Sequence, residues 1–395
     1  MRATPLHPPH LHRIAVPLLL LLVAPVFQAC SNRPGSITFT EFRFAVKTGN
    51  ITLAQTLLNS SPNLITARDL RGWTPLHWAV LAGQLQMTQF LLDKHADIEA
   101  KNDNGATPLH DAAYVDQAQI AELLLRRGAK VDPVDNFTNT PLGDTALEGS
   151  LNAAKVLLGH HAALEFRTKS GATPLILACE KGNTALVDLF ISQHAAIEAR
   201  DNNGFTALQF ALWKKQLDSV ALLLEAHADP NSLSNEGVTA MHTVADSGSV
   251  AAFELLVVRG AKIDVPDSKG YTPLHTAAIS GKVRVAGLLI DHGANVNVSD
   301  KSQDTPLHRA AIAGNTSIAE LLLAKGADIN ARDYQNATPL HYAAADGHVE
   351  LTEFLIDHGA DMTIKTKLGC TPLRGARDYH QKATEEVLLR HGGPG

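Results

Sequence analysis

The chain has 395 residues, of which 45% are hydrophobic, 19% are charged and 5% are aromatic, and its formal net charge is −6. These proportions are those of a globular protein and exclude a chain that is disordered throughout. An acidic chain without a basic run is also a poor candidate for binding nucleic acid.

The first 29 residues have the layout of a secretory signal peptide. Arg2 and Arg13 come before an apolar run at 14–27, which contains two prolines. A membrane-spanning helix needs about 20 apolar residues, so this run is too short to be one. We expect residues 1–29 to be removed. Removal takes away two arginines and no acidic residue, so the net charge changes from −6 to −8.

Cys30 follows this segment directly after an alanine. A small residue before a cysteine resembles the lipobox of bacterial lipoproteins, although Phe27 and Gln28 depart from its usual residues. The resemblance implies that Cys30 is diacylated and that residues 30–36 form the lipidated cysteine and a tether. With Ser31 next, it implies an outer-membrane lipoprotein of the bacterial cell envelope, facing the periplasm or the surface. The alternatives are a cleaved signal without lipid, giving a periplasmic or secreted protein, and an uncleaved anchor.

A threonine recurs every 33 residues, without a slip, through most of the chain. Proline follows it in eight of the ten copies, and leucine comes next in nine. A fixed period of this length is typical of a solenoid built from stacked repeats. The ten positions are Thr74, Thr107, Thr140, Thr173, Thr206, Thr239, Thr272, Thr305, Thr338 and Thr371.

The cycle at 267–299 shows what one repeat is expected to build. Thr272 is a good N-cap, and Pro273 suits the first position of a helix. His275 stands at the third position, from which its imidazole can reach back to the cap. Gly281 stops this short helix in the left-handed conformation, and a second helix with an apolar stripe follows. Each repeat is therefore predicted to be a turn, a short helix, a longer helix and a return.

The pattern Asp-x-x-Gly-x-Thr-Pro-Leu-His-x-Ala-Ala, with a later Leu-Leu-x-x-Gly-Ala, resembles that of ankyrin repeats. Its fullest copies lie at 270–278 and 336–344, and the resemblance covers about residues 37–393. It implies one all-α domain over 37–393. That domain would be an ankyrin solenoid of helix-turn-helix pairs with β-hairpin fingers and a concave face that binds other proteins.

The first and last units are expected to be caps. Residues 37–64 keep only part of the register counted from Thr40, and Arg374, Arg377 and His380 replace the usual residues of the last copy. Terminal repeats that face water are atypical in solenoids. We therefore expect about eleven repeats, two of them degenerate caps.

Three internal repeats, between about 140 and 240, also depart from the pattern. Gly143 replaces the usual histidine, Ala207 and Ala240 replace proline, and Lys215 stands where glycine would end a helix. Sequence drift explains these departures, because neighbours in a stack support a poor repeat. A specialised patch is the alternative.

No group of residues in the sequence proposes a reaction. Most of the 19 histidines fall at fixed places in the repeat, six of them in the slot of His275. No Cys/His cluster has zinc spacing, no phosphate-binding or nucleophile motif occurs, and aspartates such as Asp69 and Asp300 mark finger turns. Cys179 and Cys370 lie six repeats apart, too far for a disulfide within one chain. We expect no catalytic residue, no cofactor and no metal site.

In the ankyrin family, partners contact the finger residues four, three and one before the threonine and the residues seven and eight after it. Aromatic residues are scarce in this chain, yet its three tryptophans fall in or near such positions. Trp and Tyr contribute most to binding at interfaces. The preferred surface is the ridge from Trp73 to Trp213, flanked by Asp103, Glu148 and Lys214. The predicted protein-binding residues are Trp73, Leu81, Tyr114, Phe137, Phe205, Trp213, Tyr271 and Tyr334.

The sequence thus predicts a monomeric, non-catalytic scaffold that binds another protein. The leader predicts that it is exported and anchored in the cell envelope through a lipid on Cys30. Nothing in the sequence names the partner. A secreted effector acting on host proteins is one alternative, and an accessory protein of envelope stress defence, which no residue constellation supports, is another.

Overall fold

The computed structural model describes residues 34–394 of the chain, so the expected signal peptide and Cys30 lie outside the described residues. Over residues 34–394 the chain forms 22 α-helices, one 3-10 helix and no β-strand. These residues fall into two compact units, one ending at Ala195 and the other beginning at Ala196. None of the described helices is long and apolar enough to span a membrane.

The helices of the first unit are α1 (Pro34–Thr48), α2 (Ile51–Ser60), η1 (Pro62–Thr66), α3 (Pro75–Leu81), α4 (Leu85–Asp93), α5 (Pro108–Tyr114), α6 (Ala118–Arg126), α7 (Pro141–Glu148), α8 (Leu151–Gly159), α9 (Pro174–Lys181) and α10 (Thr184–Ser192). The helices of the second unit are α11 (Ala207–Trp213), α12 (Leu217–Glu225), α13 (Ala240–Ser247), α14 (Val250–Val258), α15 (Pro273–Ser280), α16 (Val283–Asp291), α17 (Pro306–Ala313), α18 (Thr316–Ala324), α19 (Pro339–Ala345), α20 (Val349–Asp357), α21 (Pro372–Asp378) and α22 (Lys382–Arg390).

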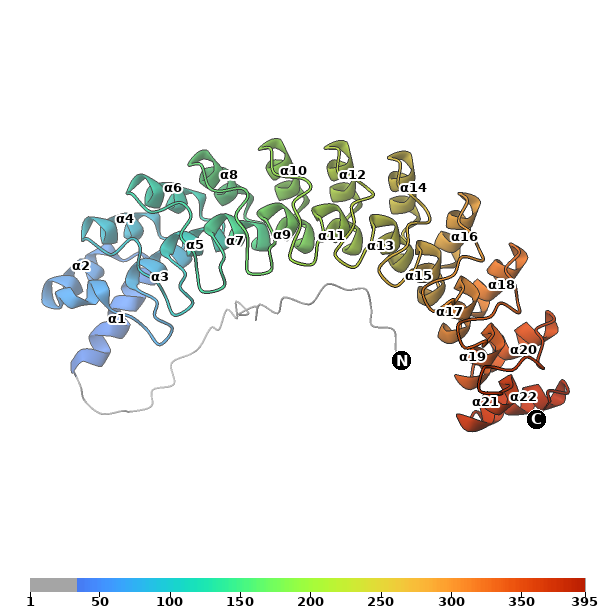
Figure 1. Cartoon of the computed structure of the whole chain (residues 1–395). Coiled ribbons are helices and arrows are strands. Elements are labelled where there is room, and N and C mark those ends of the chain that lie inside the picture. Colours follow the sequence, from blue (N-terminus) through green and yellow to red (C-terminus); the bar gives the residue numbers. More distant parts are fainter. Residues whose placement is uncertain (1–33, 395) are drawn as a thin grey trace. The chain divides into compact units, whose positions relative to one another are not determined.

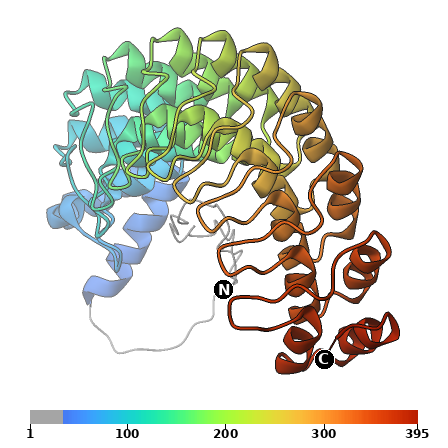
Figure 2. The same cartoon turned by 45° about the vertical axis from the view of Figure 1, so that its right-hand side comes forward.

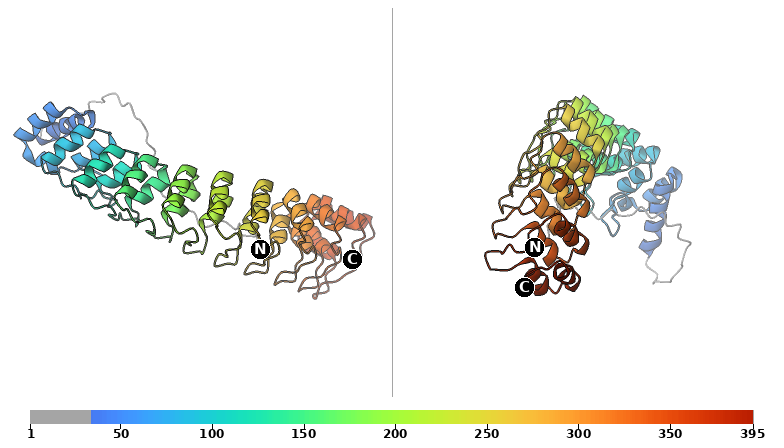
Figure 3. Two further views of the ribbon diagram at one scale, coloured as in Figure 1. Left: turned by 90° about the horizontal axis from the view of Figure 1, so that it is seen from above. Right: turned by 90° about the vertical axis from the view of Figure 1, so that its right-hand side faces the viewer.

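Within each unit the helices stack in two rows. The first helices of the repeats carry odd numbers and pack on one another, as α3, α5, α7 and α9 do in the first unit. The second helices carry even numbers and form the other row, as α12 to α22 do in the second unit (Figure 1). The finger loops of each unit project to one side, next to the first helices (Figures 2 and 3). The helix-turn-helix repeat predicted from the 33-residue period is confirmed.

The start of each first helix follows from the Thr-Pro-Leu-His pattern. In α15 the backbone N–H of Thr272 donates to Nδ1 of His275, at 3.1 Å. Because Nδ1 accepts this bond, the proton lies on Nε2, which donates to the carbonyl of Asp304 in the next repeat, at 3.0 Å. Burial lowers the pKa of His275 to about 4, so the ring is neutral. This histidine therefore caps its own helix and ties it to the next repeat.

The finger aspartates are turn residues, as predicted. Oδ1 of Asp300 accepts from the backbone N–H groups of Ser302 and Asp304, at 2.7 and 3.0 Å. Adjacent fingers are joined by one backbone bond, such as that from the Lys301 N–H to the Lys269 carbonyl at 3.0 Å. The predicted β-hairpins are minimal, since the described residues contain a single isolated bridge, between Arg200 and Thr206.

Left-handed backbone ends many helices, and other residues take it where glycine is missing. His95, His161, His194 and His227, predicted to replace the glycine after the second helix, have φ between 62° and 65°. Lys215, in the glycine position after α11, has φ of 60°. The repeat therefore fixes this conformation even for side chains that disfavour it.

The two terminal repeats differ from the others in different ways. Helix α1 begins at Pro34, so it includes three residues expected to belong to the tether, and Thr40 lies inside the helix instead of capping it. At the other end, Arg374 pairs with Asp378 and Arg377 pairs with Glu385, both at 2.8 Å. These ion pairs give the last repeat a polar surface.

Candidate functional site

In the first unit, the predicted contact residues lie on the fingers and first helices. Phe137, in a finger, is 50% exposed, whereas Trp73, Leu81 and Tyr114 are half-buried. A fully buried aromatic residue would serve the core, so this exposure leaves all four able to touch a partner. Their role in binding stays a prediction.

Trp78, which the sequence placed near the contact positions, is a core residue. It is 0% exposed, and its Nε1–H donates to Oδ2 of Asp69 at 3.1 Å. Its ring also packs edge-on against Phe39, with ring centroids 5.5 Å apart. It lies four residues after Thr74, where the side chain turns toward the finger aspartate instead of outward.

In the second unit, Tyr334 is 59% exposed and Nζ of Lys367 lies 4.0 Å from the centre of its ring. Phe205, Trp213 and Tyr271 are half-buried. Nζ of Lys214 lies 4.3 Å from the Trp213 ring, so the flanking lysine predicted from sequence does contact the tryptophan. The predicted ridge is therefore described as two surfaces, one in each unit.

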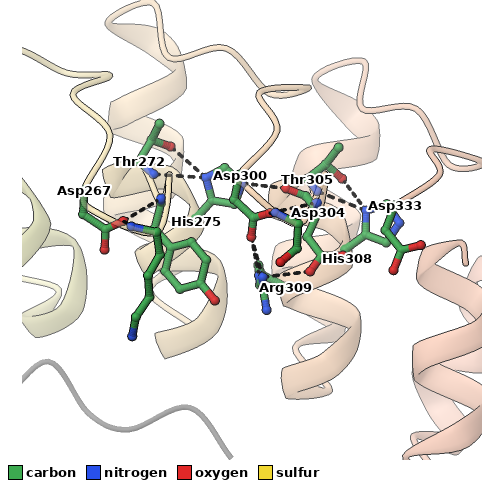
Figure 4. A network of polar contacts seen from close by, with 12 residues as sticks. Asp267, Thr272, His275, Asp300, Asp304, Thr305, His308, Arg309 and Asp333 are labelled. Atoms are coloured by element: carbon green, nitrogen blue, oxygen red, sulfur yellow. Dashed lines mark hydrogen bonds and ion pairs between the residues drawn. The ribbon is translucent and has the colours of Figure 1, made fainter. Parts of the chain in front are cut away.

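A polar network gathers around Arg309 on the first helices of the second unit (Figure 4). The Arg309 guanidinium donates to Oδ2 of Asp300, from Nε at 3.1 Å and from a second nitrogen, and it lies 2.7 Å from Oδ2 of Asp304. Its Cζ lies 4.6 Å from the centre of the Tyr271 ring. In the next repeat, the Tyr342 hydroxyl donates to Oδ2 of Asp333 at 2.5 Å. We call Asp267, Asp300, Asp304 and Asp333 the acidic cluster.

Asp304 is the least satisfied member of the acidic cluster. The residue is 4% exposed, and Oδ1 has no hydrogen-bond partner. Burial raises the pKa of Asp304 to about 7, the Arg309 charge opposes this shift, and the negative charge of Asp300 adds to it. The carboxyl group therefore changes its charge near neutral pH.

A second buried acidic pair lies in the first unit. Asp111 on α5 is 7% exposed, with Oδ2 unpartnered, and burial together with the charge of Asp144 holds its pKa well above the usual range. The Asn139 amide donates to Asp144 at 2.5 Å, in space left open by Gly143, where a Cβ would lie 2.2 Å from Asn139 Oδ1. The Asn139 side chain thus occupies space next to Gly143 that a longer side chain would need, without making the histidine's two bonds.

The other groups of chemical interest in residues 34–394 are possible metal ligands and the cysteines. In this part of the chain no group of three or more His, Cys, Asp or Glu side chains is arranged to hold a metal ion. Cys179 is buried, which raises the pKa of its thiol, and it and Cys370 are free thiols.

The sequence reasoning missed Asp304, Arg309 and Tyr342. A signal was available, because Asp304 is the single charged residue among the ten that directly precede a repeat threonine. Arg309 is likewise the single cation among the ten that stand four after it. Alignment of the repeats by column would have found both.

Comparison with known families agrees with the geometry. The family described as ankyrin repeats (3 copies) matches residues 42–135, 142–234, 214–300, 240–333, 297–366 and 333–393. No curated protein matches the chain. Since the family matches cover far more than half of the sequence, the chain belongs to the ankyrin-repeat family, whose repeats generally bind other proteins.

Proposed function

We propose that the protein is a non-catalytic scaffold that, as a monomer, binds a partner protein through its fingers and first helices. The observation that carries the proposal is the exposure of large aromatic side chains at finger positions, 50% for Phe137 and 59% for Tyr334. Such side chains contribute little to the core of a repeat but much to an interface. The half-buried Trp73, Trp213 and Tyr271 extend the two surfaces.

We further propose that the protein is exported and held in the bacterial cell envelope by a lipid on Cys30. Support comes from the sequence: an apolar run too short to span a membrane is followed by a small residue and a cysteine. A single acyl chain gives only reversible membrane binding, whereas two give stable anchoring, so a diacylated cysteine would suffice.

The binding surface can be tested by photo-crosslinking. A photoreactive phenylalanine analogue replaces Phe137 or Tyr334 in cells, and the matched control carries it at Val258, which is 81% exposed at the end of α14. We expect one discrete crosslinked protein from the two finger positions and none from Val258. Equal crosslinking at all three positions would show that the fingers are not the binding surface.

The anchor can be tested with a fatty-acid probe. Wild-type protein should take up the probe and fractionate with membranes, and Cys30→Ser should lose both properties. Cys370→Ser is the control, because that residue lies in a finger of the repeat array. A wild-type protein that carries no label, or that is recovered from the medium, would refute anchoring but leave the binding proposal standing.

A further inference from the structure

The acidic cluster contains more carboxyl groups than the Arg309 guanidinium pairs with. It contains four carboxyl groups, and the Arg309 guanidinium pairs with two of them, those of Asp300 and Asp304 (Figure 4). When all four are ionised, the cluster and Arg309 together carry a net charge of −3. Opposite charge within a few ångströms would stabilise such a group strongly, because the site is shielded from water.

The repeat itself does not require an acid at Asp304. The same position holds Ala337 and Cys370 in the next two repeats, and in both the backbone carbonyl still accepts from the histidine of the preceding repeat, at 3.1 Å. The carbonyl of Asp304 makes the same bond with His275, at 3.0 Å. The carboxyl group is therefore additional to the frame, and an unpartnered buried oxygen destabilises the isolated fold.

Aromatic rings stand next to the acidic cluster. Tyr271 lies against Arg309 and is half-buried, and so is Tyr342, whose hydroxyl donates to Asp333. Tyr271 occupies one of the positions predicted to contact a partner. Carboxylates beside aromatic faces are the environment that ammonium and guanidinium groups prefer.

We propose that the acidic cluster of the second unit receives a lysine or arginine side chain of the partner protein. This inference rests on the proposed function and adds the chemical class of the partner: a basic segment, with its cation placed beside Asp304 and Asp333 and its stem against Tyr271 or Tyr342. An acidic segment would meet a net negative charge and is excluded by it.

The surroundings of Asp304 also determine whether it gains or loses a proton when a cation binds. The groups that face it are Arg309, Asp300 and Asp333, with Tyr271 and Tyr342 on either side and the neutral rings of His275 and His308 on α15 and α17. Asp304 is partly protonated near pH 7, and an incoming cation favours its ionised form. Binding should therefore release a fraction of a proton at neutral pH.

The test selects, from a library of short random peptides, those that bind the full-length wild-type protein. The affinities of the selected peptides are then compared between wild type, Asp304→Asn and Asp304→Ala. Alanine occupies this position in other repeats, so the second variant is compatible with the fold. We expect wild-type protein to enrich peptides with Lys or Arg at one fixed position. Either variant should lower their affinity at least about tenfold. In a selected peptide with arginine at the fixed position, replacing that arginine by citrulline should lower the affinity to the same extent. Citrulline is neutral and has nearly the same shape.

The control is Asp291→Asn, which removes an exposed acid on α16 that pairs with Lys325. It should leave peptide affinity unchanged. Calorimetry in two buffers of different ionisation enthalpy should detect proton release for wild type and none for Asp304→Asn. The free Asp304→Asn protein should melt at the same or a higher temperature than wild type, whereas a residue kept for structure would lower the melting temperature.

The outcomes separate this inference from the proposed function. Enriched peptides without a basic preference, or with affinities that Asp304→Asn and Asp304→Ala leave unchanged, would overturn the cationic site while the protein remained a binding scaffold. A wild-type chain that enriches no peptide at all would count against both.

Discussion

At the scale of single residues, the histidine that follows Thr-Pro-Leu joins two repeats as well as capping a helix. Nδ1 of His308 accepts from the Thr305 N–H at 3.1 Å, and its Nε2–H donates to the Ala337 carbonyl at 3.1 Å. In the repeat where glutamine replaces it, Gln209 accepts from Thr206 at 3.0 Å and donates to Val238 at 2.7 Å. The third position of the first helix therefore requires a side chain that accepts one hydrogen bond from the cap N–H and donates one to the next repeat.

This requirement predicts different effects for two substitutions. His308→Ala leaves a buried N–H and a buried carbonyl unpaired and should lower the free energy of unfolding by about 2 kcal/mol or more. His308→Gln restores both bonds and should cost less than about 1 kcal/mol. Urea unfolding followed by circular dichroism measures the difference. Equal losses for the two variants would mean that ring packing, and not hydrogen bonding, holds the position.

The sequence predicted the bond from the cap N–H to the histidine but not the bond from the histidine to the next repeat. Thr272, Pro273 and His275 are neighbours in the chain, so local rules are enough to place the cap. The bond from His275 to the Asp304 carbonyl spans 29 residues and depends on how closely two repeats stack. The same limit hid Arg309, whose partners Asp300 and Asp304 define a site only when the finger folds back onto α17.

At the scale of helices, the end of each first helix depends on one left-handed residue. After α13 that residue is Gly248, with φ of 76°, and after α11 it is Lys215, with φ of 60°. A residue with a Cβ is strained there by about 1–2 kcal/mol, whereas glycine is not. Part of the gain from a glycine is lost, because glycine makes the unfolded chain more flexible.

Lys215→Gly should therefore stabilise the second unit slightly, by about 0.5 kcal/mol. Gly248→Ala, at the equivalent place, should destabilise it by about 1 kcal/mol or more, since its Cβ would also lie 2.9 Å from Cδ of Lys282. Thermal melting of the two variants measures both effects. A lower melting temperature for Lys215→Gly would show that the lysine side chain makes a contact that outweighs the backbone strain.

Helix boundaries were predictable wherever Thr-Pro precedes a helix and glycine follows it. Thr-Pro placed the start of α15, and the glycine after it placed the end. The first repeat has no Thr-Pro, and there the register counted from Thr40 gives the end of α1, at Gly49 with φ of 73°, but not its start at Pro34. Pro34 stands at the first position of this helix but outside the 33-residue register, so the repeat pattern does not predict its first turn.

At the scale of the whole molecule, the period predicted the repeat, the helix pairs and the two rows, because each repeat contacts mainly its neighbours. It did not predict that the described residues form two compact units dividing at Ala195 and Ala196. Within the first unit, Gly143 carries no side-chain N–H, so its repeat cannot make a bond of the kind that His275 makes.

The histidines also make the stability of both units depend on pH. Burial lowers the pKa of His77 and His275 to about 4 and lowers that of His242, His308 and His341. In the unfolded chain their pKa is near 6.5, so between pH 6.5 and about 4 the unfolded state binds protons that the folded state does not. Their contribution to stability is complete above pH 6.5 and is lost as the pH falls through this window.

Buried acids act in the opposite sense. The pKa of Asp304 is raised to about 7 and that of Asp111 is raised well above its usual range, so each stabilises the fold when protonated, and this contribution disappears as the pH rises through the raised pKa. Burial also raises the pKa of Asp132, Asp201 and Asp264, so five acids oppose the five histidines. The histidine contribution is therefore measured by removing it.

The variant His77→Gln with His275→Gln isolates the histidine contribution, with one substitution in each unit. Glutamine keeps both hydrogen bonds, as Gln209 does, but does not titrate. Near pH 7 the variant should melt close to wild type. At pH 4.5 it should lose less stability than wild type, by about 1 kcal/mol or more for each histidine, because a shift of one pKa unit corresponds to about 1.4 kcal/mol. Melting curves recorded at several pH values test this, and parallel curves for the two proteins would show that other groups cause the acid sensitivity.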